Sequence, residues 1–323
     1  MLRKNIQTVS GLIPNEKLGF CHSHEHLFIA PGPSARVNPA LRIDDFEKTV
    51  EELRMYKELG GQSIVDAQPV GCGRMAEYLA ESSRKTGVNI IASTGFHKLI
   101  FYAEDHWIKC LDEDELADIF IHELEKGMFV DGDYKMPEKA VPSKAGVIKT
   151  ASDGEGITPE YRKLFKAAAR ASKSTGFSIL SHTEMGKHAL EQIELFAKEG
   201  VNPDCVIICH LDRDLSDIEY HRAVAETGVF MEYDTIGRFK YHSDMEEAKF
   251  IAKMVELGFE DRILLGLDTT RDRLKSYGGK IGLGYIKQEF IPLLLEVGIT
   301  EGIIEKFTIK NPSEALAKRS ETV

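Results

Sequence analysis

The sequence predicts a single (β/α)8 barrel, an α/β fold in which parallel strands alternate with helices. Two observations predict it: a recurring unit of amphipathic helix, glycine and apolar strand, and eight strand candidates spread over 323 residues. A doubly wound open sheet is the structural alternative, but no GxGxxG motif follows the first strand. The strand candidates cover 18–26, 62–67, 88–94, 146–150, 178–183, 205–211, 228–234 and 262–268. We expect residues 1–323 to form one domain.

The helix ends of the repeat are marked by glycine, which adopts the left-handed conformation beyond a helix without a Cβ clash. These residues are Gly60, Gly87, Gly176, Gly200, Gly228 and Gly258.

Three helix starts are marked by capping residues: Asp44-Asp45, Thr158-Pro159 and Ser243-Asp244. The strands between the helices, such as VIIC and RILLGL, are apolar without alternation. Such strands are typical of a parallel sheet covered by helices on both faces.

The longest gap between strands, 94–146, predicts an insertion after strand 3. It contains a helix near 113–126 and then the Gly- and Pro-containing stretch 127–146, GMFVDGDYKMPEKAVPSKAG. We expect this stretch to be an insertion or a lid loop.

Composition excludes several classes of protein. With 52 acidic against 41 basic side chains and a formal net charge of −11, the chain is a poor candidate for a nucleic-acid binder that works through bulk charge. No apolar run reaches the length of a membrane-spanning helix, and the N-terminal segment lacks the apolar core of a signal peptide. The 5 cysteines are scattered without a CxxC pair. Reduced thiols and a cytoplasmic location are therefore expected.

Polar side chains occur at the predicted carboxyl ends of five strands, where barrel enzymes carry their active sites. One histidine beside an apolar run is more often a hydrogen-bonded core residue, and an aspartate there is often a helix cap. Several together at one end of a barrel predict a metal centre instead. The HxH pair at the first strand places both imidazoles on one face. The set is His24, His26, Lys149, His182, His210 and Asp268.

Lys149 allows two interpretations. A lysine at the end of a buried strand could be a Schiff-base nucleophile with a lowered pKa, but this leaves the histidines and Asp268 unexplained. Alternatively, its amine could react with CO2 to give a carbamate, an anion whose two oxygens can bridge two metal ions.

The remaining histidines have structural interpretations. His22 shares the face of His24 by the period of two and is expected in the lower barrel, outside the metal site. The others on helices or loops are expected at the surface: His106, His122, His188, His221 and His242.

Five motifs resemble the phosphotriesterase-like family of the amidohydrolase superfamily: TVSGLIPNEKLGFCHSHEHL, GVIKTAS around Lys149, LSHTEMG, ICHLDR and GLDTTR. The C-terminal segment also matches that family, so the resemblance spans essentially the whole chain. It implies an amidohydrolase-type barrel and a binuclear metal centre in which carboxylated Lys149 and a hydroxide bridge the ions. Zinc is favoured, and manganese, cobalt or iron are compatible with the same ligands.

Each role in that centre is also implied by the resemblance. His24, His26 and Asp268 would hold the more buried ion, and His182 with His210 the more exposed one. Asp268 would also be catalytic, taking a proton from the attacking hydroxide during hydrolysis. Relatives are commonly homodimers, although the periodicity of this chain shows no interface.

The predicted loops after strands 7 and 8 are basic although the protein is acidic. We expect Lys240, Arg271 and Tyr277 to bind an anionic group such as phosphate, with Arg238 and Arg273 as weaker candidates; an ordinary solvated charge cluster is the alternative. His97 and Lys98 follow a TG pair where lactonases for acylated homoserine lactones carry tyrosines, which favours a polar substrate and makes His97 a further candidate for binding it.

The substrate pattern is most similar to the sugar-lactone and phosphorylated sugar-lactone hydrolases of the family. The sequence therefore predicts a lactonase acting on a phosphorylated furanolactone. Two alternatives stay open: a phosphotriesterase or acyl-homoserine lactonase, and a non-enzymatic relative that binds without catalysis.

Overall fold

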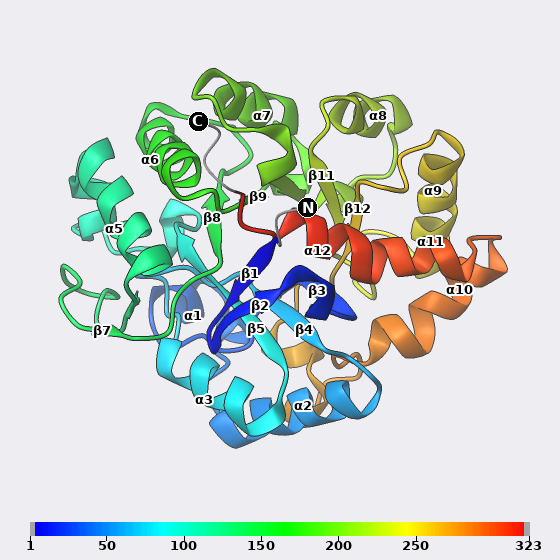
Figure 1. Cartoon of the computed structure of the whole chain (residues 1–323), viewed down its shortest axis with the longest axis horizontal. Coiled ribbons are helices and arrows are strands. Elements are labelled where there is room, and N and C mark those ends of the chain that lie inside the picture. The colour runs from blue at the N-terminus through cyan, green and yellow to red at the C-terminus, as the bar shows by residue number, and fades with distance from the viewer. Residues whose placement is uncertain (1–3, 320–323) are drawn as a thin grey trace.

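The structure, a computed structural model, describes residues 4–319 and is built around one eight-stranded parallel sheet (Figure 1). Its strands follow one another in the order β3-β4-β5-β8-β9-β10-β11-β12. They are β3 (Cys21–Glu25), β4 (Ser63–Asp66), β5 (Asn89–Gly95), β8 (Val147–Ala151), β9 (Ile179–His182), β10 (Val206–Cys209), β11 (Phe230–Tyr233) and β12 (Ile263–Leu265). All eight lie within or within one residue of the predicted strand ranges.

The first and last strands lie against each other. The Ser23 hydroxyl donates to the carbonyl of Leu265 (2.8 Å), and the Asp268 N–H donates to the carbonyl of His24 (3.0 Å). Gly266 permits this approach, because a Cβ there would lie 3.1 Å from the backbone nitrogen of His24. These contacts bring the two ends of the sheet together, so that it is nearly closed into the predicted barrel.

The amino-terminal half of the barrel is filled by apolar side chains from every strand. Ile6 of β1 (Asn5–Thr8) and Leu18 complete this cluster from below, where β1 pairs with β2 (Gly11–Pro14) in a hairpin that crosses the barrel in Figure 1. The strand residues are Cys21, Val65, Ile91, Val147, Leu180, Ile207, Cys209, Phe230 and Leu264. Because this end is packed, only the carboxyl ends of the strands can hold a cavity.

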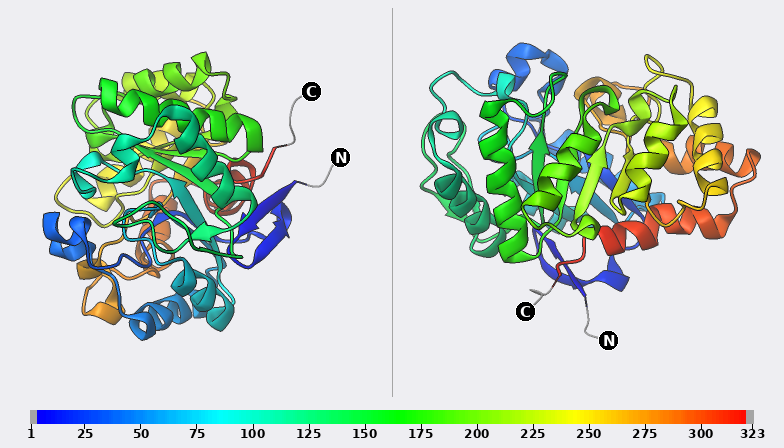
Figure 2. Two further views of the ribbon diagram at one scale, coloured as in Figure 1. Left: turned by 90° about the vertical axis from the view of Figure 1, so that its left-hand side faces the viewer. Right: turned by 90° about the horizontal axis from the view of Figure 1, so that it is seen from above.

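Helices surround the barrel (Figure 2) and bury apolar faces against the outside of the sheet. The predicted caps are present: Asp45, Thr158 and Ser243 each accept a backbone N–H at the start of a helix. The predicted C′ glycines are left-handed, for example Gly176 with φ 76°. The helices are α1 (Pro33–Val37), α2 (Phe46–Glu58), α3 (Ala76–Thr86), α4 (Trp107–Cys110), α5 (Glu113–Glu125), α6 (Pro159–Thr175), α7 (Ala189–Lys198), α8 (Ile218–Glu226), α9 (Asp244–Glu256), α10 (Ile291–Glu296), α11 (Glu301–Glu305) and α12 (Asn311–Ala315).

The predicted insertion after the third barrel strand contains α4, α5 and the short hairpin β6 (Met128–Phe129) with β7 (Ala140–Val141). A buried Arg74–Glu123 pair (2.6 Å) joins α5 to the barrel, and Glu123 also accepts the N–H of Phe129 (2.8 Å). The hairpin lies at the periphery in Figure 1, and no part of 127–146 lines the active-site cavity described below. The stretch 127–146 is therefore an insertion, as one of the two expectations had it, and it does not cover the cavity as a lid would.

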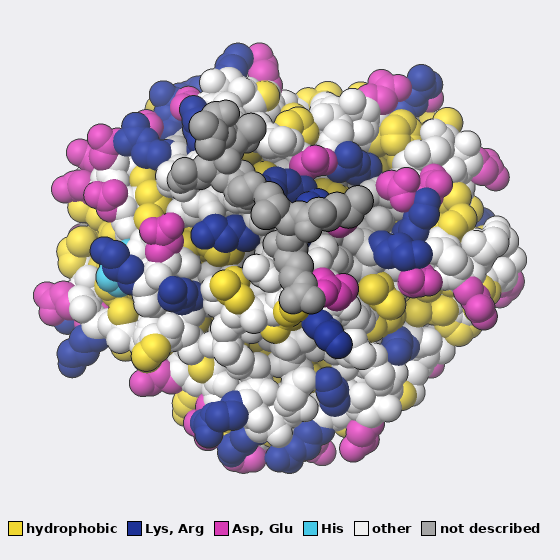
Figure 3. Space-filling model, in the orientation of Figure 1, with side chains coloured by type: hydrophobic (Ala, Val, Ile, Leu, Met, Phe, Trp, Pro, Cys, Tyr) yellow, Lys and Arg dark blue, Asp and Glu magenta, His cyan; other side chains and the backbone are white. Residues whose placement is uncertain are grey.

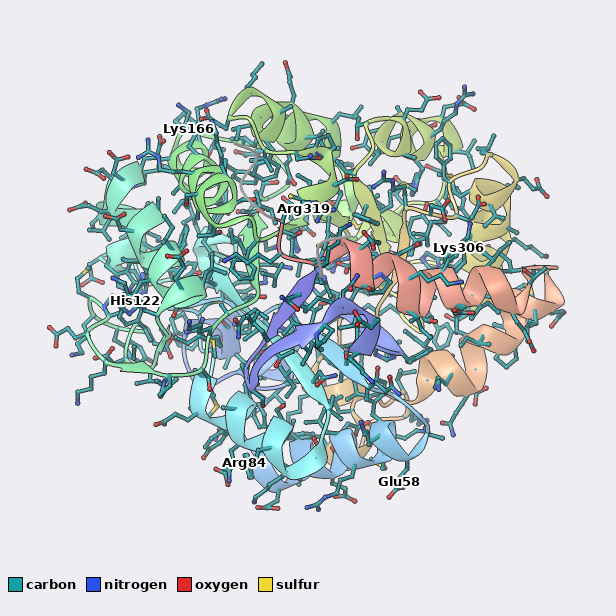
Figure 4. The ribbon with its side chains drawn as sticks, in the orientation of Figure 1. Glu58, Arg84, His122, Lys166, Lys306 and Arg319 are labelled. Atoms are coloured by element: carbon teal, nitrogen blue, oxygen red, sulfur yellow. The ribbon has the colours of Figure 1, made fainter. Side chains whose placement is uncertain are left out.

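The outer surface carries charges of both signs. Figure 3 shows lysine and arginine interspersed with aspartate and glutamate on the amino-terminal face, and Figure 4 shows Glu58, Arg84 and Lys166 on the surrounding helices. Within residues 4–319, no helix is both long and apolar enough to cross a membrane.

Candidate metal centre and active-site cavity

The six predicted metal ligands converge at the carboxyl end of the barrel. His24 Nε2 lies 3.2 Å from Lys149 Nζ and 3.9 Å from Asp268 Oδ1, and His26 Nε2 lies 3.4 Å from the same Asp268 oxygen. The rings of His182 and His210 are 4.4 Å apart, and the rings of His24 and His210 are 4.8 Å apart. All six side chains are buried. Nitrogen and oxygen donors are thus gathered from five strands.

Two buried carboxylates on β11 and just after it orient two of the imidazoles. Glu232 Oε2 lies 2.7 Å from His24 Nδ1, while Asp234 lies 2.7 Å from His210 Nδ1 and 3.1 Å from His24 Nδ1. A histidine that donates Nδ1–H to a carboxylate presents Nε2 as the lone-pair donor, the usual arrangement behind metal-binding histidines. The far sides of His24 and His210 are therefore set for metal binding.

Three of the imidazoles are held neutral, as metal ligands must be. Burial lowers the pKa of His24 and His210, and it lowers the pKa of His182 to about 3. Burial opposes ionisation of Asp268, but the Arg238 guanidinium and a hydrogen bond to His26 hold its pKa well below the ordinary value. These three imidazoles therefore offer neutral nitrogens, and Asp268 offers an ionised carboxylate, at neutral pH.

Backbone geometry places two of these ligands. His210 (φ 64°) and Asp268 (φ 47°) both adopt the left-handed conformation, which is uncommon and costly outside glycine. The carboxylate of Glu25 accepts the backbone N–H groups of Leu267 (3.0 Å) and Thr269 (3.1 Å), and so fixes the turn on both sides of Asp268.

Lys149 is fully buried at the end of β8. Its Nζ contacts His24 Nε2, and among the described residues no carboxylate pairs with it. A buried lone ammonium is costly, whereas a carbamate among metal ions would be balanced by charge. The donor set thus fits a pair of divalent cations.

An open cavity of about 230 Å³ lies over these residues and has a basic wall. Arg213 and Arg238 each reach Asp268 Oδ2, at 2.9 Å and 3.0 Å. The cationic lining residues are Lys98, Arg213, Arg238 and Lys240.

Comparison with known proteins agrees with this geometry. Residues 4–316 match the model of the phosphotriesterase family. A phospho-furanose lactonase of Mycoplasmopsis agalactiae is 35% identical over 324 residues, which cover 97% of this chain and 92% of that protein. The crystal structure of an amidohydrolase from Mycoplasma synoviae superposes with a TM-score of 0.94 at 32% identity, covering 99% of this chain and 94% of the other. A lactonase from Listeria monocytogenes gives a TM-score of 0.89 at 34% identity, with 98% and 100% covered.

The chain belongs to the phosphotriesterase family. As a member of this family it is a hydrolase of ester bonds, which confirms the predicted family and enzyme class. The ligand roles of the individual residues stay predictions.

In this phosphotriesterase-family barrel, the four predicted substrate-binding residues are separated. His97 and Lys240 line the cavity. Arg271 lies outside it, in a neighbouring depression with Arg36 and Arg42. The Tyr277 hydroxyl hydrogen bonds to Thr49 Oγ1 (2.8 Å) and to the carbonyl of Asp45 (2.8 Å), so it is directed at the start of α2. Of the weaker candidates, Arg238 lines the cavity, and buried Arg273 donates to backbone carbonyls.

Several residues of the site were not predicted. Glu232 interrupts the apolar strand VFMEY and Asp234 follows it directly, a pattern that could have identified them. Arg213 lies three residues after His210, but its direction depends on the path of the turn Leu211–Arg213.

The predicted surface position is wrong for two of the remaining histidines, and for His22, which lies outside the metal site as expected, the predicted face is wrong. The pairing of β3 with β4 shifts register between His22 and Glu25, so His22 packs edge-on to Tyr56 (4.8 Å between ring centroids) instead of sharing the face of His24. Its Nδ1 lies 2.8 Å from Glu25 Oε1. His106 and His221 are buried, because each ring hydrogen bonds to a backbone carbonyl within the packed core.

Proposed function

We propose that this protein is a binuclear metal-dependent lactonase that hydrolyses a sugar lactone, specifically a phosphorylated furanolactone. The observation that carries the proposal is a set of nitrogen and oxygen ligands beneath a cavity lined by cationic side chains. The Mycoplasmopsis relative is named phospho-furanose lactonase, which supports the same substrate class. Five unpaired cysteines, four of them buried, support a cytoplasmic location.

The metal ligands are assigned as follows. His24, His26 and Asp268 would hold one ion, His182 and His210 the second, and Lys149 would bridge both as a carbamate. Imidazole and carboxylate donors suit zinc, and they also suit manganese, cobalt or iron. Two such cations would polarise the substrate carbonyl and allow water to act as a nucleophile at neutral pH.

The chain's own residues then handle the proton. Asp268 is the candidate proton acceptor because its carboxylate faces the cavity and is ionised. Arg213 and Arg238 hold its Oδ2 in place from two different loops, at 2.9 Å and 3.0 Å. The accepted proton would pass from Asp268 to the oxygen that leaves when the lactone ring opens.

His97 is suited to donate a hydrogen bond to the substrate. Its Nδ1 accepts the backbone N–H of Lys98 (2.7 Å), so in the neutral ring the proton lies on Nε2. Burial, with His182 and Lys149 nearby, holds the pKa of His97 well below its ordinary value. A neutral donor at this position can bind a sugar hydroxyl or carbonyl oxygen.

Lys240 is the strongest candidate for the phosphate. Lys98 forms an ion pair with Glu184 (2.9 Å), and Arg213 and Arg238 share the carboxylate of Asp268. Lys240 packs over the ring of Tyr241 (4.5 Å), and among the described residues it forms no ion pair. Arg271 and Tyr277 remain candidates for contacts at the rim.

A pH-stat assay of the metal-loaded protein tests the proposal. The panel contains phosphorylated furanolactones, the same lactones without phosphate, acyl-homoserine lactones and neutral phosphotriesters. We expect the phosphorylated lactones to be cleaved with the highest kcat/KM. Loss of a hydrogen-bonded ion pair is worth about 1.5–3 kcal/mol, so Lys240→Ala should reduce kcat/KM for them roughly 10- to 150-fold.

The matched control is Lys249→Ala, on the exposed face of α9, which should leave these values unchanged. If the phosphorylated lactones stay intact while neutral triesters or acyl-homoserine lactones are cleaved, the proposal is wrong and one of the alternative activities replaces it.

A further inference from the structure

A second group of potential metal ligands lies apart from the catalytic cavity. The ligand atoms of Asp212, His242 and Glu247 all lie within 4.8 Å of one another. Asp212 belongs to the turn after β10, His242 ends the loop that follows β11, and Glu247 lies in the first turns of α9. None of the three lines the active-site cavity or belongs to the six predicted ligands.

The polar atoms of this group are buried without partners. Glu247 has an exposed fraction of 0%, and neither of its carboxylate oxygens accepts a hydrogen bond from an N–H or hydroxyl group among the described residues. Asp212 Oδ1 and His242 Nε2 are unpartnered as well. Such atoms are costly to bury unless something binds them.

The charge of the group is also unbalanced. Within residues 4–319, neither carboxylate forms an ion pair with lysine or arginine, and His242 Nδ1 lies 3.7 Å from Glu247 Oε2. A dication would compensate two carboxylates in full.

We propose that Asp212, His242 and Glu247 form a third metal site, which takes a divalent transition-metal cation such as Zn²⁺. Two carboxylates and one imidazole are ligands that zinc and manganese accept, and a fourth position can be filled by water. The site is independent of the identity of the lactone substrate.

The position of the site indicates what the ion does. The loop 235–243 carries Arg238, Lys240 and Tyr241, all of which line the catalytic cavity. At its start, the Thr235 N–H donates to Asp212 Oδ2 (2.6 Å), and at its end lies His242. A cation shared by Asp212, His242 and Glu247 therefore closes the base of this loop and holds it against the turn that follows His210.

Metal analysis of the full-length protein tests the proposal. The wild type, Glu247→Gln and His242→Gln are expressed with excess Zn²⁺, desalted into metal-free buffer and measured by plasma mass spectrometry. Both variants should contain one equivalent less than the wild type, and Glu256→Gln, at an exposed position of the same helix, should match the wild type. The readout is the difference in zinc content between each variant and the wild type. It therefore depends neither on lactonase activity nor on full loading of the catalytic centre.

The zinc content separates this site from a metal-free Asp212–Glu247 pair that shares a proton, and enzyme kinetics then report the effect of the cation on the loop. Loss of the cation should loosen loop 235–243, so KM should rise more than kcat falls in both variants. If Glu247→Gln and His242→Gln are folded by circular dichroism and keep the zinc content of the wild type, the proposal is overturned. If either variant does not fold, wild-type crystals decide: anomalous density at the zinc edge between these side chains supports the site, and its absence refutes it.

Discussion

Asp234→Asn should weaken both metal ions of the catalytic centre at once. Asp234 lies 2.7 Å from His210 Nδ1 and 3.1 Å from His24 Nδ1, which belong to different ions in the proposed assignment. An asparagine of the same shape has one acceptor oxygen, and its NH2 group would face the second ring's N–H. One imidazole therefore loses the partner that fixes its tautomer, and the other keeps only a neutral acceptor in place of a carboxylate, so both rings become weaker ligands.

The magnitude follows from the number of contacts. Loss of a hydrogen-bond partner behind a metal-binding histidine costs about 10- to 100-fold in metal affinity, or about 1.4–2.7 kcal/mol. Glu232 lies near His24 alone, at 2.7 Å, so Glu232→Gln should weaken one ion by that amount. Asp234→Asn should weaken both.

Competition with a chromophoric zinc chelator measures the two binding steps. Glu232→Gln should shift one step and Asp234→Asn both, while Asp118→Asn, at an exposed position of α5, should shift neither. The reasoning fails if Asp234→Asn releases zinc at the same chelator concentrations as the wild type.

Three further predictions concern packing and pH. Leu180→Ala removes a buried side chain from the barrel interior and should lower the free energy of unfolding by about 2–5 kcal/mol in urea titrations, whereas Leu12→Ala, at a position 59% exposed, should change it by less than about 0.5 kcal/mol. Gly95→Ala should reduce both stability and bound zinc, because Gly95 has φ 91° and a Cβ there would collide with the backbone of Lys149; a wild-type zinc content would contradict this. Burial lowers the pKa of His106 to about 4, so the unfolded chain takes up a proton near pH 6.5 that the folded protein refuses. Stability of the metal-free protein should therefore fall as the pH drops from about 6.5 to about 4, and His106→Gln should reduce that slope; an unchanged slope would count against this assignment.

The fold could be predicted from the sequence because most barrel strands are apolar and the helices between them begin at capping residues or end at glycine. The boundaries were less accurate where an apolar run continues beyond the sheet. The candidate 18–26 begins before β3 because Leu18 is apolar, yet it closes the bottom of the barrel instead of pairing. The candidate 262–268 extends past β12 because the chain leaves the sheet at Gly266 to bring Asp268 over the cavity.

The six candidate ligands could be predicted for a related reason. In a parallel barrel all carboxyl ends meet, so residues distant in sequence converge without any knowledge of side-chain direction. No comparable rule predicts which way the side chains of the candidate substrate-binding residues point. Whether Tyr277 faces the cavity or α2 depends on the short turn Lys275–Tyr277 and on Thr49, more than two hundred residues earlier in the chain.

The sign of charge changes with distance from the metal centre, and this order has a physical reason. Carboxylates such as Glu232 and Asp234 lie behind the imidazoles, where they strengthen them as ligands, while Lys240 and Arg238 line the cavity on its outer side. If these carboxylates and cationic side chains exchanged places, the cationic side chains would face the metal ions and the carboxylates would face an anionic substrate. Both interactions would be repulsive. The net charge of −11 is therefore compatible with an anionic substrate, since the field that such a substrate meets is set by the nearest side chains and distant surface charge is screened.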